Sequence, residues 1–157
     1  MSSSIGKDPL FCNGSALRKA SRRLSQLYDA VLAPCGLSSS QRSILLHVVR
    51  GNRPCMTELA QSLVLDRSAL ARNIQPLERD GYLVQMRDEK DGRTRRVGLT
   101  PKGRAKLDES NRLWKQAQHR FETAYGSERA AALRVALAEI YSDEFSDAFS
   151  NRKPLHP

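Results

Sequence analysis

Cysteine is scarce in this sequence, and long apolar runs are absent from it. Its three cysteines, Cys12, Cys35 and Cys55, are an odd number at wide spacing, which argues against a disulfide framework and favours a reducing compartment. No apolar run approaches the roughly 18 residues that a membrane-spanning helix needs, and the first residues lack the apolar core of a secretory signal. We therefore expect a soluble, cytoplasmic protein.

Residue groups that would support an enzyme or a metal site are also missing. The cysteines form no Cys-x-x-Cys pair, and the three histidines form no metal-ligand pattern with them. We find no nucleophile beside a base, no carboxylate pair suited to a cleft and no glycine loop that could cradle a phosphate. These absences predict a protein that is not an enzyme and needs neither metal nor cofactor.

Positive charge is abundant, and it is concentrated. The 157 residues suit a single domain covering 1–157, and the net charge is +9. Residues 87–106 hold eight bases against three acids, a net of +5, whereas residues 127–147 carry a net of −3. A local basic field of this kind favours a polyanionic partner, with nucleic acid ahead of an anionic membrane.

The first half of the chain has the apolar period of helices. A stripe of apolar residues predicts a helix over about 10–34. Ser38 with Gln41 three residues later has the pattern of a capping box and predicts the start of a second helix. Two short helices follow, beginning near Thr57 and after Asp66, and their tight connection makes them a helix-turn-helix candidate.

Signals of a hairpin and of two further helices come next. Residues 82–86 and 95–99 have strand character, and the Asp-Gly pair at 91–92 between them is typical of a hairpin turn. Thr100 with Pro101 predicts the start of a long helix to about Tyr125, and a last helix carries the apolar residues of 133–149. Within the second short helix, Pro76 predicts a bend or an end just before it.

This order of elements defines a mainly α fold with a small β-hairpin wing, the winged helix-turn-helix. In such a domain the second short helix enters the major groove of double-stranded DNA, and the basic hairpin reaches the phosphates or the minor groove. Two alternatives stay open. An architectural protein would bind DNA without sequence preference, and a protein-binding winged helix would not need the basic tip.

Five short motifs, in this order, resemble those of the MarR family of bacterial repressors, and the similarity covers about residues 10–149. The motifs are Thr-Glu-Leu-Ala at 57–60, Asp-Arg-Ser-Ala-Leu at 66–70, Leu-Glu-Arg-Asp-Gly-Tyr-Leu at 77–83, Asp-Gly-Arg at 91–93 and Leu-Thr-Pro-Lys-Gly at 99–103. The resemblance implies a homodimer. It also implies a DNA-binding lobe at about 38–100 and dimerisation helices at about 10–34 and 101–149.

The candidate DNA-binding residues lie on the second short helix and in the hairpin. On the helix, the residues off the apolar stripe are Arg67, Ser68, Ala69, Arg72 and Asn73. The alternative for them is a merely solvated helix face. In the hairpin the candidates are Asp91, Arg93 and Arg95, and the resemblance makes Asp91 and Arg93 the aspartate and arginine of the wing.

Two hairpin positions need separate expectations. The common wing pattern of the family is Asp-Arg-Arg, and Gly92 here replaces its middle arginine, which predicts a more flexible wing. Arg95 and Arg96 are neighbours on a strand, so they lie on opposite faces of it. We therefore expect one of the two to pair with the second short helix, the recognition helix, or with Asp88 instead of with DNA.

Regulation has two candidate inputs. In the first, an aromatic or carboxylate effector of the kind the family binds sits between the two regions, near Arg22, Tyr28 and His47, although a histidine on an apolar helix is usually structural. In the second, Cys12 is a redox sensor, placed much as in the peroxide-sensing OhrR branch. A thiol near a helix start and close to Arg18 would be acidic, and the alternative is a small buried apolar side chain.

We expect a homodimeric transcriptional repressor that binds a palindromic operator. Apolar stripes on the first and last helices are too apolar for the surface of a lone small domain, so we expect a partner subunit to cover part of them. The two recognition helices would then lie about 34 Å apart, which places the half-sites one helical turn apart.

Overall fold

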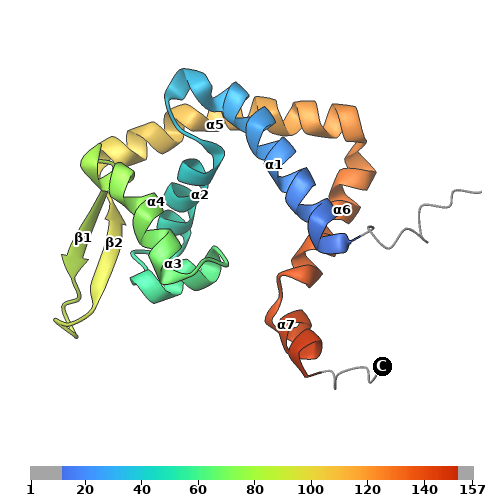
Figure 1. The fold of residues 1–157 in the computed structure, drawn as a ribbon. Coiled ribbons are helices and arrows are strands. Elements are labelled where there is room, and N and C mark those ends of the chain that lie inside the picture. The colour runs from blue at the N-terminus through green and yellow to red at the C-terminus, as the bar shows by residue number, and fades with distance from the viewer. Residues whose placement is uncertain (1–11, 152–157) are drawn as a thin grey trace, which may run out of the picture. The chain divides into compact units, whose positions relative to one another are not determined.

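The computed structural model describes residues 12–151, and helices dominate them (Figure 1). Their contacts separate two compact units, one ending at Ala117 and the other beginning at Gln118. The elements in chain order are α1 Asn13–Leu32, η2 Ala33–Cys35, α2 Ser39–Arg50, α3 Met56–Ser62, α4 Arg67–Arg79, β1 Leu83–Arg87, β2 Arg95–Leu99, α5 Pro101–Tyr125, α6 Ser127–Ile140 and α7 Asp143–Ser150. None of these helices is both long enough and apolar enough to cross a bilayer.

Side-chain caps set the start of several helices. The predicted capping box is confirmed, because Ser38 Oγ accepts from the Gln41 amide at 3.1 Å and Gln41 Oε1 accepts from the Ser38 amide at 2.9 Å. The predicted cap of α4 is confirmed as well, since Asp66 Oδ1 accepts from the Ala69 amide at 2.7 Å. Each such cap satisfies an amide that lacks a partner within its helix and is worth about 1 kcal/mol.

One apolar core holds the first unit together. Leucines of three successive helices, Leu45, Leu59 and Leu70, are completely buried, and Val97 of β2 and Leu107 of α5 join the same cluster. Each such side chain contributes about 1.5–3 kcal/mol by leaving water. The core therefore fixes α3, α4 and the hairpin against one another.

The hairpin is antiparallel and is tied to the turn before α3. Leu83 pairs with Leu99 and Arg87 with Arg95, so β1 lies one residue later than the predicted 82–86. The Val97 amide donates to the Pro54 carbonyl at 2.9 Å, and Cys55 forms a bridge with Arg96. In Figure 1 the two strands project beside α3 and α4.

Two expectations about helix boundaries need correction. Helix α4 continues through Pro76 to Arg79, so it does not end before the proline. The proline has no N–H, so α4 lacks the backbone bond that this residue would otherwise donate to the Arg72 carbonyl. The expected last helix is two helices, because Ser142 Oγ accepts from the Phe145 amide at 3.1 Å and so caps a new helix, α7.

Candidate nucleic-acid interface

Helix α4 has one buried face and one exposed face. Leu70, Ile74 and Leu77 are at most 1% exposed and hold the helix in the core. The opposite face contains the five candidates from the sequence. Ala69 is half-buried, and the exposed ones are Arg67, Ser68, Arg72 and Asn73. The hydrogen bond that the Ala69 amide donates to Asp66 Oδ1 fixes the first turn of α4, so a rigid element presents this face.

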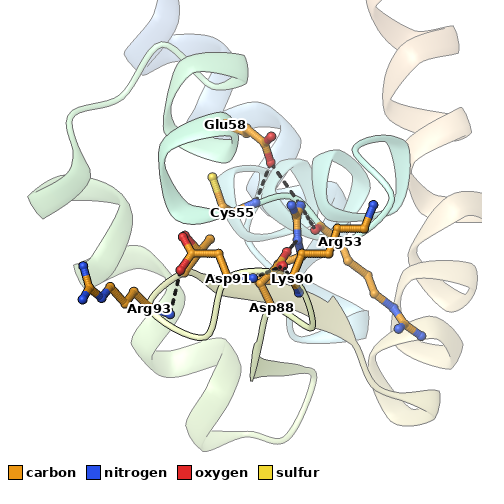
Figure 2. A network of polar contacts seen from close by, with 9 residues as sticks. Arg53, Cys55, Glu58, Asp88, Lys90, Asp91 and Arg93 are labelled. Atoms are coloured by element: carbon orange, nitrogen blue, oxygen red, sulfur yellow. Dashed lines mark hydrogen bonds and ion pairs between the residues drawn. The ribbon is translucent and has the colours of Figure 1, made fainter.

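The candidate arginines of the hairpin are exposed and unpaired. Within residues 12–151, the guanidinium groups of Arg93 and Arg95 make no hydrogen bond or ion pair, and those of Arg67 and Arg72 on α4 make none either. In Figure 2 the side chain of Arg93 extends away from the network of polar contacts at the base of the hairpin. All four charges are therefore available to an external anion.

Arg96 differs from Arg95, as the alternation along the strand predicts. Its Nε donates to Asp88 Oδ2, its Nη1 donates to the Arg53 carbonyl at 3.2 Å, and Nη1 also lies 3.5 Å from Glu58 Oε2. Figure 2 shows Arg53, Glu58 and Asp88 in one network of polar contacts. The pairing with Asp88 is confirmed, and Arg96 ties the hairpin to α3 and to the turn before it.

Asp88 is the main acceptor at the base of the hairpin turn. The Arg96 side chain lowers the pKa of its carboxyl to about 2, helped by the amides of Asp91 and Lys90, which donate to Oδ1 at 3.0 and 2.8 Å. Hydrogen bonds to the charged form of a carboxyl favour that form. Asp88 is therefore ionised at any physiological pH and organises the turn.

Asp91 directs its carboxylate into the turn. Oδ1 accepts from the Arg93 amide at 3.1 Å, and Oδ2 accepts from the Thr94 hydroxyl at 2.9 Å. Gly92, between them, is not among the residues with positive φ, and a Cβ at this position would have no atom within 4 Å. The turn therefore does not require glycine at position 92.

A buried arginine is the feature that sequence reasoning missed. Arg42 of α2 is 6% exposed, and its guanidinium lies 4.7 Å from the ring centre of Trp114 and donates to Asn111 Oδ1 at 2.8 Å. Its Nε has no hydrogen-bond partner among residues 12–151, and burial lowers the pKa of the group. The available signal was its position three residues before Leu45, on the apolar stripe of α2.

The three effector candidates lie on the first two α-helices of the chain. Arg22 is exposed on α1 and Tyr28 is half-buried on the same helix. His47 on α2 donates from Nδ1 to the Ser43 carbonyl at 2.8 Å. It lines a pocket of about 380 Å³ with residues of α3 and β2, and neither Arg22 nor Tyr28 lines that pocket.

Cys12 is exposed at the N-cap position of α1, so the alternative of a small buried side chain is wrong. The amides of Ser15 and Gly14 lower the pKa of its thiol, and the charge of Arg18 adds to their effect. Cys35 is buried and donates to the Leu32 carbonyl at 3.0 Å. Of these two cysteines, Cys12 has the environment expected of a reactive thiol.

A helix-turn-helix followed by a basic two-stranded hairpin defines a winged-helix DNA-binding domain, and the family model of that description matches residues 37–103. The repressor CouR, solved bound to a 23-mer DNA duplex, is 30% identical over 83% of this chain and 93% of its own, with a TM-score of 0.76. The Mycobacterium tuberculosis regulator MosR, solved in complex with DNA, is 31% identical over 91% of this chain and all of its own, with a TM-score of 0.77.

The chain belongs to the MarR family of DNA-binding transcriptional regulators. A curated relative, an uncharacterised HTH-type transcriptional regulator from Bacillus cereus, is 29% identical over 84 residues. Those residues are 54% of this chain and 55% of that protein, so the chain spans about half the length of this curated relative. These relatives are described as regulators and not as enzymes.

Proposed function

We propose that this protein is a homodimeric repressor that binds a palindromic DNA site through α4 and the wing. The observation that carries the proposal is the set of unpaired arginines on two adjacent elements of one rigid lobe. Arg67, Arg72, Arg93 and Arg95 are exposed and have no acidic partner within residues 12–151. An arginine that is always charged and forked suits both base edges and phosphates.

Within this proposal each candidate has a role. Ser68, Ala69 and Arg72 contact base edges from α4, Asn73 contacts a base or a phosphate, and Arg67 contacts the backbone near the helix start. Arg93 and Arg95 contact phosphates or the minor groove. Asp91 acts indirectly, because its carboxylate is occupied by the turn that presents Arg93.

Exposed apolar residues support the dimer. Leu27 of α1 is 55% exposed, Val135 of α6 is 61% exposed and Phe149 of α7 is 76% exposed. Apolar surface of this extent on helices is typical of a subunit interface. We infer a single MarR-type domain with a DNA-binding lobe at about 38–100 and dimerisation helices at about 10–34 and 101–149. Light scattering that finds a monomer at micromolar concentration would exclude the dimer.

Selection from a random duplex library tests the function directly. We expect the protein to enrich one palindromic motif whose half-sites are centred about 10 base pairs apart, because the recognition helices of a dimer meet the same face of the duplex. Binding without enrichment of any motif would favour the alternative of an architectural protein. Absence of binding to any duplex would exclude both.

We further propose that an aromatic or carboxylate effector releases the repressor. Arg42 supports this, because a buried guanidinium with an unpaired Nε beside an indole ring suits an anionic aromatic ligand. Arg22, Tyr28 and His47 stay candidates for further contacts. Aromatic carboxylates that release the wild-type protein from its selected duplex should fail to release Arg42→Met, which removes the charge at similar volume. Equal release of both would exclude Arg42.

A second candidate input is oxidation of Cys12. The specific observation is an exposed thiol whose pKa is lowered by the start of α1. Hydroperoxide should release the wild-type protein from DNA in a gel shift and should leave Cys12→Ser bound. Release that survives the substitution removes Cys12 from the mechanism.

A further inference from the structure

We propose that the pocket between α2, α3 and β2 binds a small anion with a carboxylate or phosphate group. Its volume of about 380 Å³ lies within the range of small-molecule sites. Arg50, Arg96 and His47 line it against a single acid, Glu58. The pocket includes neither Arg42 nor Trp114, and of the effector candidates named above only His47 lines it.

Arg50 and Arg96 each have N–H donors that no acceptor among the described residues occupies. Arg50 is exposed at the end of α2 and makes no hydrogen bond or ion pair within the described chain. The side chain of Arg96 is 39% exposed, and its Nη2 donates to no acceptor within residues 12–151. A guanidinium offers five N–H donors in a fixed fork, and that fork matches the two oxygens of a carboxylate or phosphate. Two such forks beside one pocket select an anion over a neutral ligand.

His47 adds a third polar side chain to the lining of the pocket. The Ser43 carbonyl can only accept, so Nδ1 of His47 is the protonated nitrogen of the neutral ring. This leaves Nε2 without a partner among the described residues. In the neutral ring, Nε2 can accept a hydrogen bond from a hydroxyl group on the ligand, which favours a hydroxylated or protonated acid over a bare halide.

The same pocket shares two groups with the base of the wing. Glu58 accepts from the Cys55 amide at 2.7 Å, which caps α3, and also faces Arg96. A ligand anion on Arg96 stands beside the Glu58 carboxylate, and two like charges at one site repel each other. Occupancy therefore weakens the link between β2 and α3, the first helix of the helix-turn-helix, and lowers DNA affinity. This last step rests on the proposed function.

The binding step is tested without DNA. Sodium phosphate and sodium succinate are titrated into 15N-labelled protein, with sodium chloride holding the ionic strength constant. We expect saturable shifts at the amides of Gly51, Cys55 and Glu58, with a dissociation constant of about 1 mM, which is within reach of so small a ligand. Arg50→Gln should abolish the saturation. Arg112→Gln, on a helix that contributes nothing to the pocket, should retain it. Shifts that grow linearly with the anion concentration, or shifts that saturate in Arg50→Gln as they do in the wild type, would overturn the proposed site.

The coupling step is tested on the selected duplex. At constant ionic strength, a saturating concentration of whichever anion binds should lower the DNA affinity of the wild type at least threefold and leave that of Arg50→Gln unchanged. Saturable binding of the anion with unchanged DNA affinity would overturn the coupling. If the protein binds no duplex, the proposed function fails, while the titration alone still decides whether the pocket is an anion site.

Discussion

Gly103, in the first turn of α5, lies against the backbone of Tyr82. A Cβ at position 103 would stand 2.9 Å from the carbonyl carbon of Tyr82 and closer still to its carbonyl oxygen. The Thr100 hydroxyl completes the contact, since it donates to the Gly81 carbonyl at 2.7 Å and accepts from the Gly103 amide at 3.0 Å. The start of α5 is thereby fixed to the residues that join α4 to the hairpin.

This contact predicts that Gly103→Ala destabilises the protein. In an unobstructed helix the same change would raise the free energy of unfolding by about 1 kcal/mol. Here the methyl group would push against rigid backbone, so we expect a loss of about 3 kcal/mol in urea unfolding. Gly92→Ala, where a Cβ meets nothing within 4 Å, is the matched control and should change stability by no more than about 0.5 kcal/mol. A stabilised Gly103→Ala would contradict the contact.

A substitution at Val64, in the turn between α3 and α4, is predicted to raise the stability of the protein and not to lower it. It has φ of 52° and is 68% exposed, so its branched side chain occupies the left-handed region with little burial in return. That conformation costs an ordinary residue about 1–2 kcal/mol, and asparagine tolerates it best after glycine. Val64→Asn should therefore raise the free energy of unfolding by about 1 kcal/mol.

The same substitution at Val84 serves as its control. Val84 is 40% exposed in β1 and does not have positive φ. Asparagine is a poor strand residue, so Val84→Asn should lower the free energy of unfolding by up to about 1 kcal/mol. Chemical denaturation of both variants measures the contrast. A loss of stability in both would mean that the turn at Val64 is not strained.

Local signals in the sequence were enough for the order of elements but not for the polar contacts. Ser38, Asp66 and Thr100 predicted helix starts because a cap is a contact between residues three apart. The division between α6 and α7 was missed because the apolar period continues across Ser142, which has no glycine or proline beside it. Contacts between distant residues leave no local signal of the partner. The position of Arg42 on the apolar stripe indicates burial, but nothing near it indicates its contact with Asn111, which is 69 positions away.

Asp88 predicts a pH dependence of stability. Its pKa is lowered from 3.8 to about 2 in the folded protein, chiefly by the Arg96 side chain. A depressed pKa means that the ionised carboxyl stabilises the fold above about pH 4 and that this contribution is lost as the pH falls towards 2. The stability difference between wild type and Asp88→Asn should therefore be constant from pH 7 to about pH 4 and shrink below it.

Urea midpoints measured at each pH give this difference. The control is Glu89→Gln, which removes the same charge from the same turn. Glu89 suits this purpose because it is exposed and makes no hydrogen bond or ion pair within residues 12–151. It should stay close to the wild type throughout. A difference for Asp88→Asn that persists unchanged at pH 2 would show that its pKa is not depressed.

Replacement of Gly92 by arginine is predicted to raise the affinity of the protein for DNA. Because the turn does not need positive φ and has space at this position, Gly92→Arg should fold with a stability within about 0.5 kcal/mol of the wild type. It restores the Asp-Arg-Arg pattern and places one more positive charge on the wing. DNA binding should tighten, and the slope of log K against log salt should steepen by about 0.9 for one added phosphate contact. An unchanged slope would mean that position 92 does not reach the DNA.

Salt titrations separate the roles of the α4 and wing arginines. Arg93→Ala and Arg95→Ala should each weaken binding to selected and unrelated duplexes alike and reduce the salt slope by about 0.9, because each removes a phosphate contact. Arg72→Ala should instead lose about 1–3 kcal/mol of discrimination between the selected and unrelated duplexes, because it removes a contact to a base edge. Arg120→Ala, an exposed arginine on α5, is the matched control and should change neither quantity. Identical effects of the three variants would contradict the division of roles, since a base contact and a phosphate contact differ in how strongly they depend on sequence.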